Sequence, residues 1–370
     1  MASKIEPLRS EIRGHSDDQY ERLSQLTRRL TQLSRELRLD ELRDEFDYVD
    51  ERVEGVPKDL AAIRKRGYQF GRAWEKEARN LQERWDREQD DIEELIDDTE
   101  RDLRRSLRDS ERIANRAERN LSLLSDFDRS LDTLNREIDQ AKTRVRSRWQ
   151  TTQERLATLS DGVQWAEFLL DALAEKSFDL YPNEHGVMAC KAEWRNRDEE
   201  PVGILYLTDH RVIFEQKEEK AVRKFLFITR ESKLVQDVLW ESPIGAVETV
   251  EAEDKGGFLG INVKQLLSLG FVEDIRHAQP AVRMGVILRL RDYANNEGWQ
   301  VLVEAVRSGD IENDRIDRID HANSTNPLLF TDLSSSDLPT HCPNCETKLP
   351  TIYKGMVSVT CRHCATITNL

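Results

Sequence analysis

The chain has 370 residues and a formal net charge of −15 at pH 7, and 34% of its residues are charged. This length allows two or three domains. A chain with so many charged residues is too polar to form one compact core. Because glycine and proline are few, this composition indicates a long, solvated helical element. The excess of acidic side chains argues against sequence-independent binding of nucleic acid through the overall field of the protein.

Residues 1–177 carry the apolar repeat of a helical coiled coil. In the N-terminal part of this segment, apolar residues recur at steps of three and four, with one five-residue step between Leu37 and Leu42. Such spacing forms the seam of a heptad repeat. We predict a helix break near residues 55–57, because glycine suits a helix end and proline a helix start. A second helix then extends to about Lys176, with a length of about 180 Å if it is continuous.

The second helix would leave its apolar seam in water, so we expect self-association or a hairpin. Most residues between 96 and 112 are charged. This segment is either a bend, a hairpin tip or a single helix stabilised by ion pairs, or part of an uninterrupted coil. Trp74 and Trp85 are bulky for a two-stranded coil, and they favour a multi-helix bundle core or a surface for a partner. We predict a homo-oligomer assembled through the coil.

After Lys176 the apolar pattern changes from a helical period to that of β-strands. Strand-like runs occur at residues 186–190, 202–207, 211–215, 246–250 and 282–290. Thr208, Asp209 and His210 form a tight turn between two of these runs, which predicts a hairpin. Residues 296–308 have apolar residues at helical spacing. The order predicts a small antiparallel sheet closed by one C-terminal helix, and hence a multidomain α+β protein.

The hairpin sequence is similar to that of a known family. Residues 203–214, GILYLTDHRVIF, resemble the strand–turn–strand signature of GRAM and related pleckstrin-homology-like (PH-like) domains. Residues 241–247 are similar to the segment that enters the next strand of those domains. The resemblance covers about residues 178–308. It implies a module that docks on a lipid headgroup or on a protein, without catalysis.

Lipid binding by this domain would need basic side chains. PH-like domains that bind phosphoinositides usually carry them on the loops that join the first strands. The nearest basic residues here are Lys217, Lys220, Arg223, Lys224 and Arg230. Glutamates are interleaved with them and oppose an anionic lipid, so both lipid binding and protein docking remain open. Residues 225–228, FLFI, are either a membrane-inserting tip beside this cluster or a buried strand.

Residues 309–340 are acidic and then rich in serine, asparagine and proline. This composition predicts a flexible linker. A short apolar island at residues 326–331, NPLLFT, is either a docking peptide or a segment that packs on the middle domain.

The last 29 residues contain four of the five cysteines. They form two Cys-x-x-Cys pairs separated by fifteen residues: Cys342, Cys345, Cys361 and Cys364. Each pair presents two thiolates to one tetrahedral ion, so two pairs complete a closed shell with no position for water or substrate. About thirty residues also bury too little apolar surface to fold alone. We therefore predict a structural Zn²⁺ in residues 341–370, which resemble a zinc ribbon.

The alternatives to a four-cysteine zinc site are two disulfides or four unrelated thiols. His341 and His363 are either substitute ligands or solvent-exposed neighbours of the cysteines. Many such knuckles also have glycine directly after the second cysteine. This chain has Glu346 and Ala365 at those positions instead.

The coil, the PH/GRAM-like domain and the zinc ribbon contain no constellation of residues for catalysis. We therefore predict a non-enzymatic scaffold or adaptor without a small-molecule substrate, which oligomerises through its coil and docks protein partners through the other two modules. The first alternative is a peripheral membrane protein that assembles on anionic lipid. The second is a nucleic-acid-associated zinc-ribbon factor.

The N-terminus lacks the apolar core of a signal peptide, and no stretch reaches eighteen consecutive apolar residues. We expect a cytoplasmic protein, at most peripheral at the inner face of the membrane.

Overall fold

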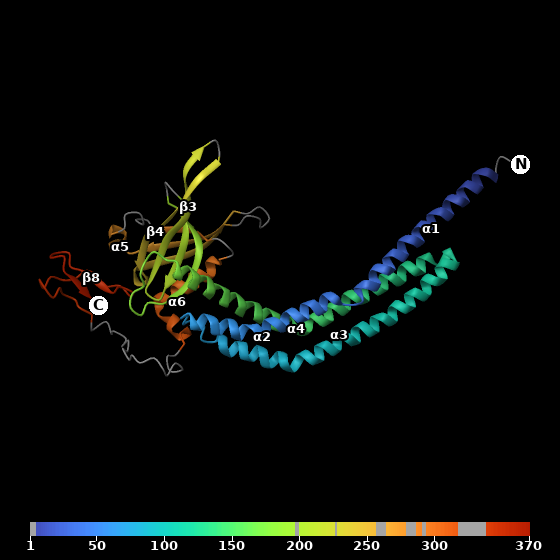
Figure 1. Ribbon diagram of the computed structural model, residues 1–370, viewed down its shortest axis with the longest axis horizontal. Helices are drawn as coiled ribbons and strands as arrows, with labels where there is room; N and C mark the ends of the chain where they lie inside the picture. The colour runs from blue at the N-terminus through green and yellow to red at the C-terminus, as the bar shows by residue number, and fades with distance from the viewer. Residues whose placement is uncertain are drawn as a thin grey trace. The chain divides into compact units, whose positions relative to one another are not determined.

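The computed structural model describes residues 5–196, 200–225, 228–256, 264–278, 286–290, 294–316 and 338–370. The chain divides into two compact units. One consists of Met1–Lys58 and Glu75–Ser160, and the other of Asp59–Trp74 and Asp161–Leu370. Figure 1 labels several of the elements and colours the chain from its N-terminus to its C-terminus. None of the helices in the described part of the chain has a segment long and apolar enough to cross a lipid bilayer.

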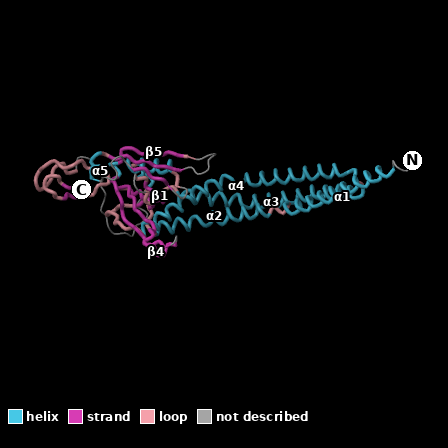
Figure 2. The backbone as a smooth tube through the Cα atoms, turned by 90° about the horizontal axis from the view of Figure 1, so that it is seen from above, coloured by secondary structure: helices cyan, strands magenta, loops and turns pink. Residues whose placement is uncertain are grey.

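The first unit is a helical bundle built from four long helices, which continue in part into the second unit. They are α1 (Ile5–Glu36), α2 (Asp40–Lys65), α3 (Trp74–Arg119) and α4 (Leu124–Ala174). Figure 2 shows these helices side by side. Their aromatic core joins three of them, because the ring of Phe46 in α2 lies 5.2 Å from that of Trp85 and 6.2 Å from that of Trp149. Trp85 therefore packs in a multi-helix core, one of the two roles predicted for it.

Ion pairs define the helix directions in the bundle. Arg146 in α4 bonds Glu45 in α2 at 2.6 Å, and Arg22 in α1 bonds Asp128 in α4 at 2.9 Å. Arg43 in α2 bonds Asp97 in α3 at 2.7 Å. Together with the Trp85 contacts, these pairs place α3 antiparallel to both α2 and α4. Exposed ion pairs of this kind contribute only about 0–1 kcal/mol each, so the buried apolar seam carries most of the stability.

The predicted helix break at residues 55–57 is wrong. Helix α2 continues through Pro57, and Val53, Val56 and Leu60 around it are all buried at helical spacing. The chain instead leaves the helix between α1 and α2, where Leu39 has a φ of +53°. The five-residue step in the apolar repeat falls at this break, because a helix that ends and restarts changes the phase of its seam.

The single long helix predicted after residue 57 is also interrupted twice. The chain first leaves the helix between α2 and α3, where Gly67 and Gly71 have φ values of +99° and +76°. It then reverses at a 3₁₀ turn, Leu121–Leu123, whose N-terminal cap is Asn120. The charged segment 96–112 lies within α3, where Leu103 and Ser110 remain buried and keep the helix on the bundle.

The antiparallel packing of α3 against α2 and α4 removes the reason for predicting a homo-oligomer. Most of the apolar residues of the predicted seam are buried within one chain, from Leu26 in α1 to Leu159 in α4. A second copy of the chain is therefore not needed to cover them.

The second unit contains a seven-stranded sheet. Its strands are β1 (Gly186–Trp194), β2 (Val202–Thr208), β3 (Arg211–Phe225), β4 (Ile228–Pro243), β5 (Val247–Lys255), β6 (Lys264–Phe271) and β7 (Val286–Leu290). All pairs are antiparallel, in the order β4-β3-β2-β1-β7-β6-β5. A short 3₁₀ turn, η3 (Ile244–Ala246), links β4 to β5, and helix α5 (Glu273–Ala278) follows β6.

The sheet encloses an aromatic core and is covered by helix α6 (Asn296–Ser308). The rings of Phe214 and Trp240 stack 6.0 Å apart, and Trp194 lies against both. Helix α6 turns Trp299 and Val303 inward, and Asn295 caps its first turn. Antiparallel strands followed by one C-terminal helix confirm the predicted α+β organisation.

Two strands of this sheet were missed by the sequence analysis. Strand β4 carries charged residues along much of its length, and it lies at an edge of the sheet with β3 as its one strand neighbour. Residues 234–239 of this strand are exposed or half-buried, so its apolar signal is weak. Strand β6 occupies Lys264–Phe271, between the strands predicted at residues 246–250 and 282–290.

The C-terminal residues form a small two-stranded element with β8 (Ser358–Thr360) and β9 (Ile367–Asn369). Its core contains Cys342, Leu349, Val359 and Cys361. The predicted flexible linker does not begin at residue 309. Residues 310–314 form the 3₁₀ helix η5, and the main-chain N–H of Ile316 donates to the carbonyl of Gln69 at 2.9 Å. Residues 317–337, including the apolar island, lie outside the described part.

Candidate functional site

The four C-terminal cysteines converge on one point. Their Sγ atoms all lie within 4.8 Å of one another, and those of Cys342 and Cys364, like those of Cys345 and Cys361, are 3.6 Å apart. Cys342, Cys345, Cys361 and Cys364 form no disulfide, so the alternative of two disulfides does not hold. A tetrahedral zinc ion with Zn–S bonds of about 2.3 Å separates its sulfur ligands by about 3.8 Å. The donor set therefore fits a closed four-sulfur metal site.

The backbone builds the two halves of this site in the same way. The N–H of Cys342 donates to the carbonyl of Thr347 at 2.8 Å, and that of Cys361 donates to the carbonyl of Thr366 at 2.9 Å. The residue after the second cysteine, Glu346 or Ala365, has a φ of +58° in both halves. These are the positions where glycine is common in such knuckles, and the left-handed backbone explains that preference.

The two threonines were missed as parts of the site. Thr347 and Thr366 each follow the second cysteine by two residues, so the repeated pattern Cys-x-x-Cys-x-Thr was a readable signal. Their hydroxyl oxygens lie 3.4 Å from the Sγ of Cys345 and 3.2 Å from that of Cys364. Side-chain and backbone hydrogen bonds with these threonines lower the pKa of both thiols. The thiolate is the form that binds metal, so these contacts favour ligation.

The two histidines beside the cysteines do not join the donor group. His341 and His363 are both exposed, and the group of converging donors among the described residues contains only the four cysteines. Both side chains are therefore solvent-exposed neighbours, one of the two roles predicted for them.

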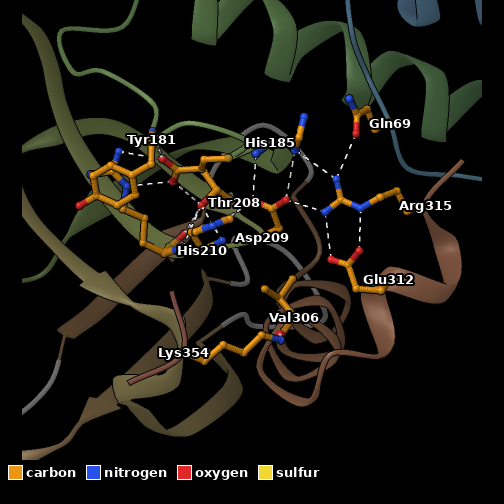
Figure 3. Close-up of polar contacts among 12 residues, drawn as sticks. Gln69, Tyr181, His185, Thr208, Asp209, His210, Val306, Glu312, Arg315 and Lys354 are labelled. Atoms are coloured by element: carbon orange, nitrogen blue, oxygen red, sulfur yellow. Dashed lines mark hydrogen bonds and ion pairs between the residues drawn. The ribbon is translucent and has the colours of Figure 1, made fainter. Parts of the chain in front are cut away.

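The turn between β2 and β3 forms a second cluster of polar contacts, shown in Figure 3. The carboxylate of Asp209 accepts hydrogen bonds from the main-chain N–H of His185 at 2.9 Å, from the ring of His210 at 2.7 Å and from Arg315 at 2.6 Å. Burial alone would raise the pKa of Asp209, but these hydrogen bonds outweigh it and hold the pKa far below its usual range. Asp209 is therefore ionised and paired at neutral pH.

Arg315 ties this turn to other parts of the unit. Its guanidinium also contacts Gln69 at 3.0 Å, in the connection between α2 and α3, and Glu312 in η5 at 2.7 Å. Figure 3 shows the arginine pointing between these groups and Asp209. Sequence reasoning had placed Arg315 in the flexible linker, because its partners are distant along the chain.

A buried ion pair lies on the other side of the turn. The side chains of Arg211 and Glu184 are 5% and 0% exposed, and their closest atoms are 2.9 Å apart. Thr208 donates to the same carboxylate at 2.7 Å, and the ring of Tyr181 stacks on the arginine with a 3.8 Å separation. A fully paired and hydrogen-bonded cluster of this kind is typical of a structural network. It holds the entry to β1 against the hairpin turn.

The ribbon lies against this end of the sheet. The main-chain N–H of Gly245 donates to the carbonyl of Lys354 at 2.9 Å, and the Nζ of Lys354 donates to the carbonyl of Val306 at 2.6 Å. Arg362 pairs with Asp274 at 2.9 Å. Beside these contacts is an open hollow of about 760 Å³, whose lining includes Asn183, His210 and Lys354.

The predicted basic cluster lies on the hairpin of β3 and β4 rather than on a loop. Lys217 bonds Glu175 at 2.6 Å. The strand register pairs Lys220 with Lys233 and Lys224 with Thr229. The side chains of Lys220, Arg223, Lys224 and Arg230 lie outside the described residues, as do Leu226 and Phe227 of the suggested membrane tip.

Comparisons with known proteins do not assign a family. The sequence matches no protein-family model. No curated protein matches it by sequence either.

Several solved structures align with much of the chain at low similarity. The linker and DH/PH domains of p115-RhoGEF are 12% identical, cover 80% of this chain and 98% of that chain, and have a TM-score of 0.22. The DH/PH domains of PDZ-RhoGEF in complex with activated RhoA are 10% identical, cover 74% and 94%, and have a TM-score of 0.24. An inhibited Vav1 is 9% identical, covers 90% and 92%, and has a TM-score of 0.22. Scores this low carry no argument about this chain.

Proposed function

We propose that this protein is a non-enzymatic adaptor whose GRAM- or PH-like domain docks on a protein partner and whose C-terminal ribbon binds a structural Zn²⁺. The observation that carries the proposal is the sheet of seven antiparallel strands closed by α6, together with the resemblance of residues 203–214 to those domains. Such a module works by presenting a surface. The charged groups at its β2–β3 turn are engaged with one another, as expected of a scaffold.

Zinc would be held by Cys342, Cys345, Cys361 and Cys364. When bound, the ion supplies a cross-link between the two knuckles and the folding free energy that this short segment lacks. The chain's own residues prepare the site through the threonine contacts and the knuckle backbone.

Metal content tests the zinc assignment directly. We expect one zinc per chain in the purified protein, measured by elemental mass spectrometry. Cys361→Ser should lose the metal, whereas the matched change Cys190→Ala, at a buried cysteine in β1, should retain it. Equal zinc content in both variants would contradict the assignment.

A protein partner is favoured over a lipid by the charges. The chain has a net charge of −15, and Lys217, the one member of the basic cluster whose side chain is described, is already paired with Glu175. Binding to an anionic bilayer would have to overcome the repulsion from this net charge and compete with Glu175 for Lys217. The self-association predicted from sequence is not part of the proposal, because the seam is buried within one chain.

The second candidate is a peripheral membrane protein, which the gathering of Lys220, Arg223 and Lys224 near the end of β3 favours. Flotation with vesicles containing phosphatidylserine and phosphoinositides, at low salt, separates the two. We expect the protein to stay in the unbound fraction. Flotation that is lost on changing these three residues to glutamate would instead establish the membrane role.

The nucleic-acid role has less support from the structure. The ribbon has three basic residues, Lys348, Lys354 and Arg362. Two of them are engaged within the protein, since Lys354 donates to the carbonyl of Val306 and Arg362 pairs with Asp274. We do not propose it.

A further inference from the structure

The segment between the two knuckles forms a tight loop, Tyr353–Met356, which we call the ribbon tip. The N–H of Met356 donates to the carbonyl of Tyr353 at 3.1 Å, and Gly355 has a φ of +89°. The tip lies against the end of the sheet where β2 turns into β3 and where β4 leads into η3. One main-chain hydrogen bond joins the two there, from the N–H of Gly245 to the carbonyl of Lys354 at 2.9 Å.

Two glycines, one on each side, make this close approach possible. A Cβ at Gly355 would overlap the carbonyl oxygen of His210, and a Cβ at Gly245 would lie 2.5 Å from the main-chain nitrogen of Lys354. The obstructing atoms are backbone atoms, so a side-chain rotation cannot relieve either overlap. The two backbones therefore approach each other so closely that only glycine fits at both positions. Two domains that did not pack on each other would have no such requirement.

Lys354 adds a polar anchor to the tip. Its Nζ reaches the carbonyl of Val306, near the C-terminal end of α6, where carbonyl groups lack partners within the helix and the helix dipole is negative. Figure 3 shows this side chain extending from the tip to the helix. Arg362, in the second knuckle, forms a further contact with Asp274. The ribbon is thus attached at three separate places.

The end of the ribbon tip and the two residues after it also lie beside the buried charge network. A hollow of about 150 Å³ lies between Gly355–Ser358 of the ribbon and the side chains of Tyr181, Arg211 and Glu241. If the tip moved away, this face of the Arg211 ion pairs would open to water.

Metal binding and docking are connected through the chain. The tip lies within the fifteen residues that join Cys345 to Cys361, so its shape depends on both knuckles being closed on one centre. A segment this small loses its fold when its metal is removed. The same event should therefore remove the tip from the sheet.

From these contacts we infer that the ribbon is a metal-dependent clasp on the PH-like domain. With the knuckles closed, the tip is held on the end of the sheet; without the metal, the tip is released and the Tyr181–Arg211–Glu241 surface is uncovered. This inference rests on the zinc site proposed above. It gives the ribbon a role within the chain instead of the predicted role in docking a protein partner.

Hydrogen exchange on the full-length protein tests the docking. Gly245→Ala adds a methyl group against the tip at a position with an ordinary φ, and Gly298→Ala in α6 is the matched control because its Cβ would meet only ordinary contacts, at 3.6 Å or more. We expect amide exchange in residues 352–357 to become at least tenfold faster in Gly245→Ala, with zinc content unchanged. Equal exchange in the two variants would overturn the inference.

Lys354→Met provides a second variant that leaves the sheet untouched. It removes the bond to Val306 and should speed exchange in the same residues. Unchanged exchange in β1 of both variants would show that the sheet remains folded.

Removal of zinc tests the metal dependence. After chelation with EDTA, exchange should rise in the ribbon and also in residues 208–211 and 243–247 at the end of the sheet. A rise confined to the ribbon would overturn the clasp. A protein that contains no zinc would contradict the metal assignment and the metal dependence, while the Gly245→Ala comparison would still decide whether the tip is docked.

Discussion

Glu346 and Ala365 occupy backbone positions that suit glycine. Both have a φ of +58° directly after the second cysteine of a knuckle, and an L-residue there costs about 1–2 kcal/mol. A glycine would remove this cost, although it also gains entropy in the unfolded chain. The C-terminal segment therefore accepts some backbone strain at each half of its four-cysteine cluster.

We predict that Ala365→Gly stabilises the ribbon by about 0.5–1 kcal/mol. Competition with a chromogenic zinc chelator should show tighter metal retention. Ala62→Gly, at an exposed site within α2, is the control and should instead destabilise the protein by about 1 kcal/mol. Weaker zinc retention in Ala365→Gly would show that the left-handed backbone is not strained.

Asp209 makes the stability of the second unit depend on pH. Its pKa is lowered in the folded protein, so its contribution is fully present above the unfolded pKa of about 3.9 and is lost as the pH falls below it. Asp209→Asn should cost about 3 kcal/mol at pH 7, because Arg315 loses a buried charged partner.

Urea unfolding at pH 7, 5 and 3 measures this effect. The difference between the native protein and Asp209→Asn should be similar at pH 7 and 5 and smaller at pH 3. Asp86→Asn, at an exposed site in α3, should change little at any pH. A difference that grows towards pH 3 would contradict the assigned pairing.

At the scale of elements, Pro57 lies where the sequence predicted a helix break and where the structure has a continuous helix. It lies well inside α2, where proline lacks the N–H that would bond the carbonyl four residues earlier and its ring crowds that carbonyl. The buried residues around it keep the chain helical in spite of this cost.

We predict that Pro57→Ala stabilises the protein by about 1–3 kcal/mol, as measured by the midpoint of urea unfolding. The control is Pro182→Ala, in a turn before β1, which should be neutral or cost about 0.5 kcal/mol. If the helix did end at residues 55–57, Pro57→Ala would bring no gain.

At the scale of the whole molecule, the burial of the helical seam within one chain leads us to expect a monomer. The apolar residues that would join two chains are used within one, and the remaining helix surface is mostly charged. A net charge of −15 adds repulsion between copies.

Light scattering at micromolar concentration should therefore give the mass of one chain, 43.1 kDa. Repeating the measurement at low and high salt checks the contribution of charge. A dimer at both salt concentrations would show that another surface joins the chains and would restore the oligomeric scaffold.

The sequence by itself determined the features that depend on local spacing. The cysteine pairs, the helical repeat, the hairpin at residues 208–210 and the helix at 296–308 each follow from residues a few positions apart, because the geometry of a turn, a helix or a strand repeats over that distance. The break between Leu37 and Leu42 was also visible as a change of phase, although we placed the interruption elsewhere.

Tertiary structure alone decided how these parts close on one another. Arg315 and Asp209 are 106 residues apart, and Gly245 meets Lys354 from a different element. Neither contact leaves a periodic pattern in the sequence. Strand β4 was missed because it has little apolar pattern of its own and is held in the sheet by backbone pairing with β3. Helix ends, edge strands and the docking of the ribbon depend on partners distant in sequence, so their positions become visible only when the chain is folded.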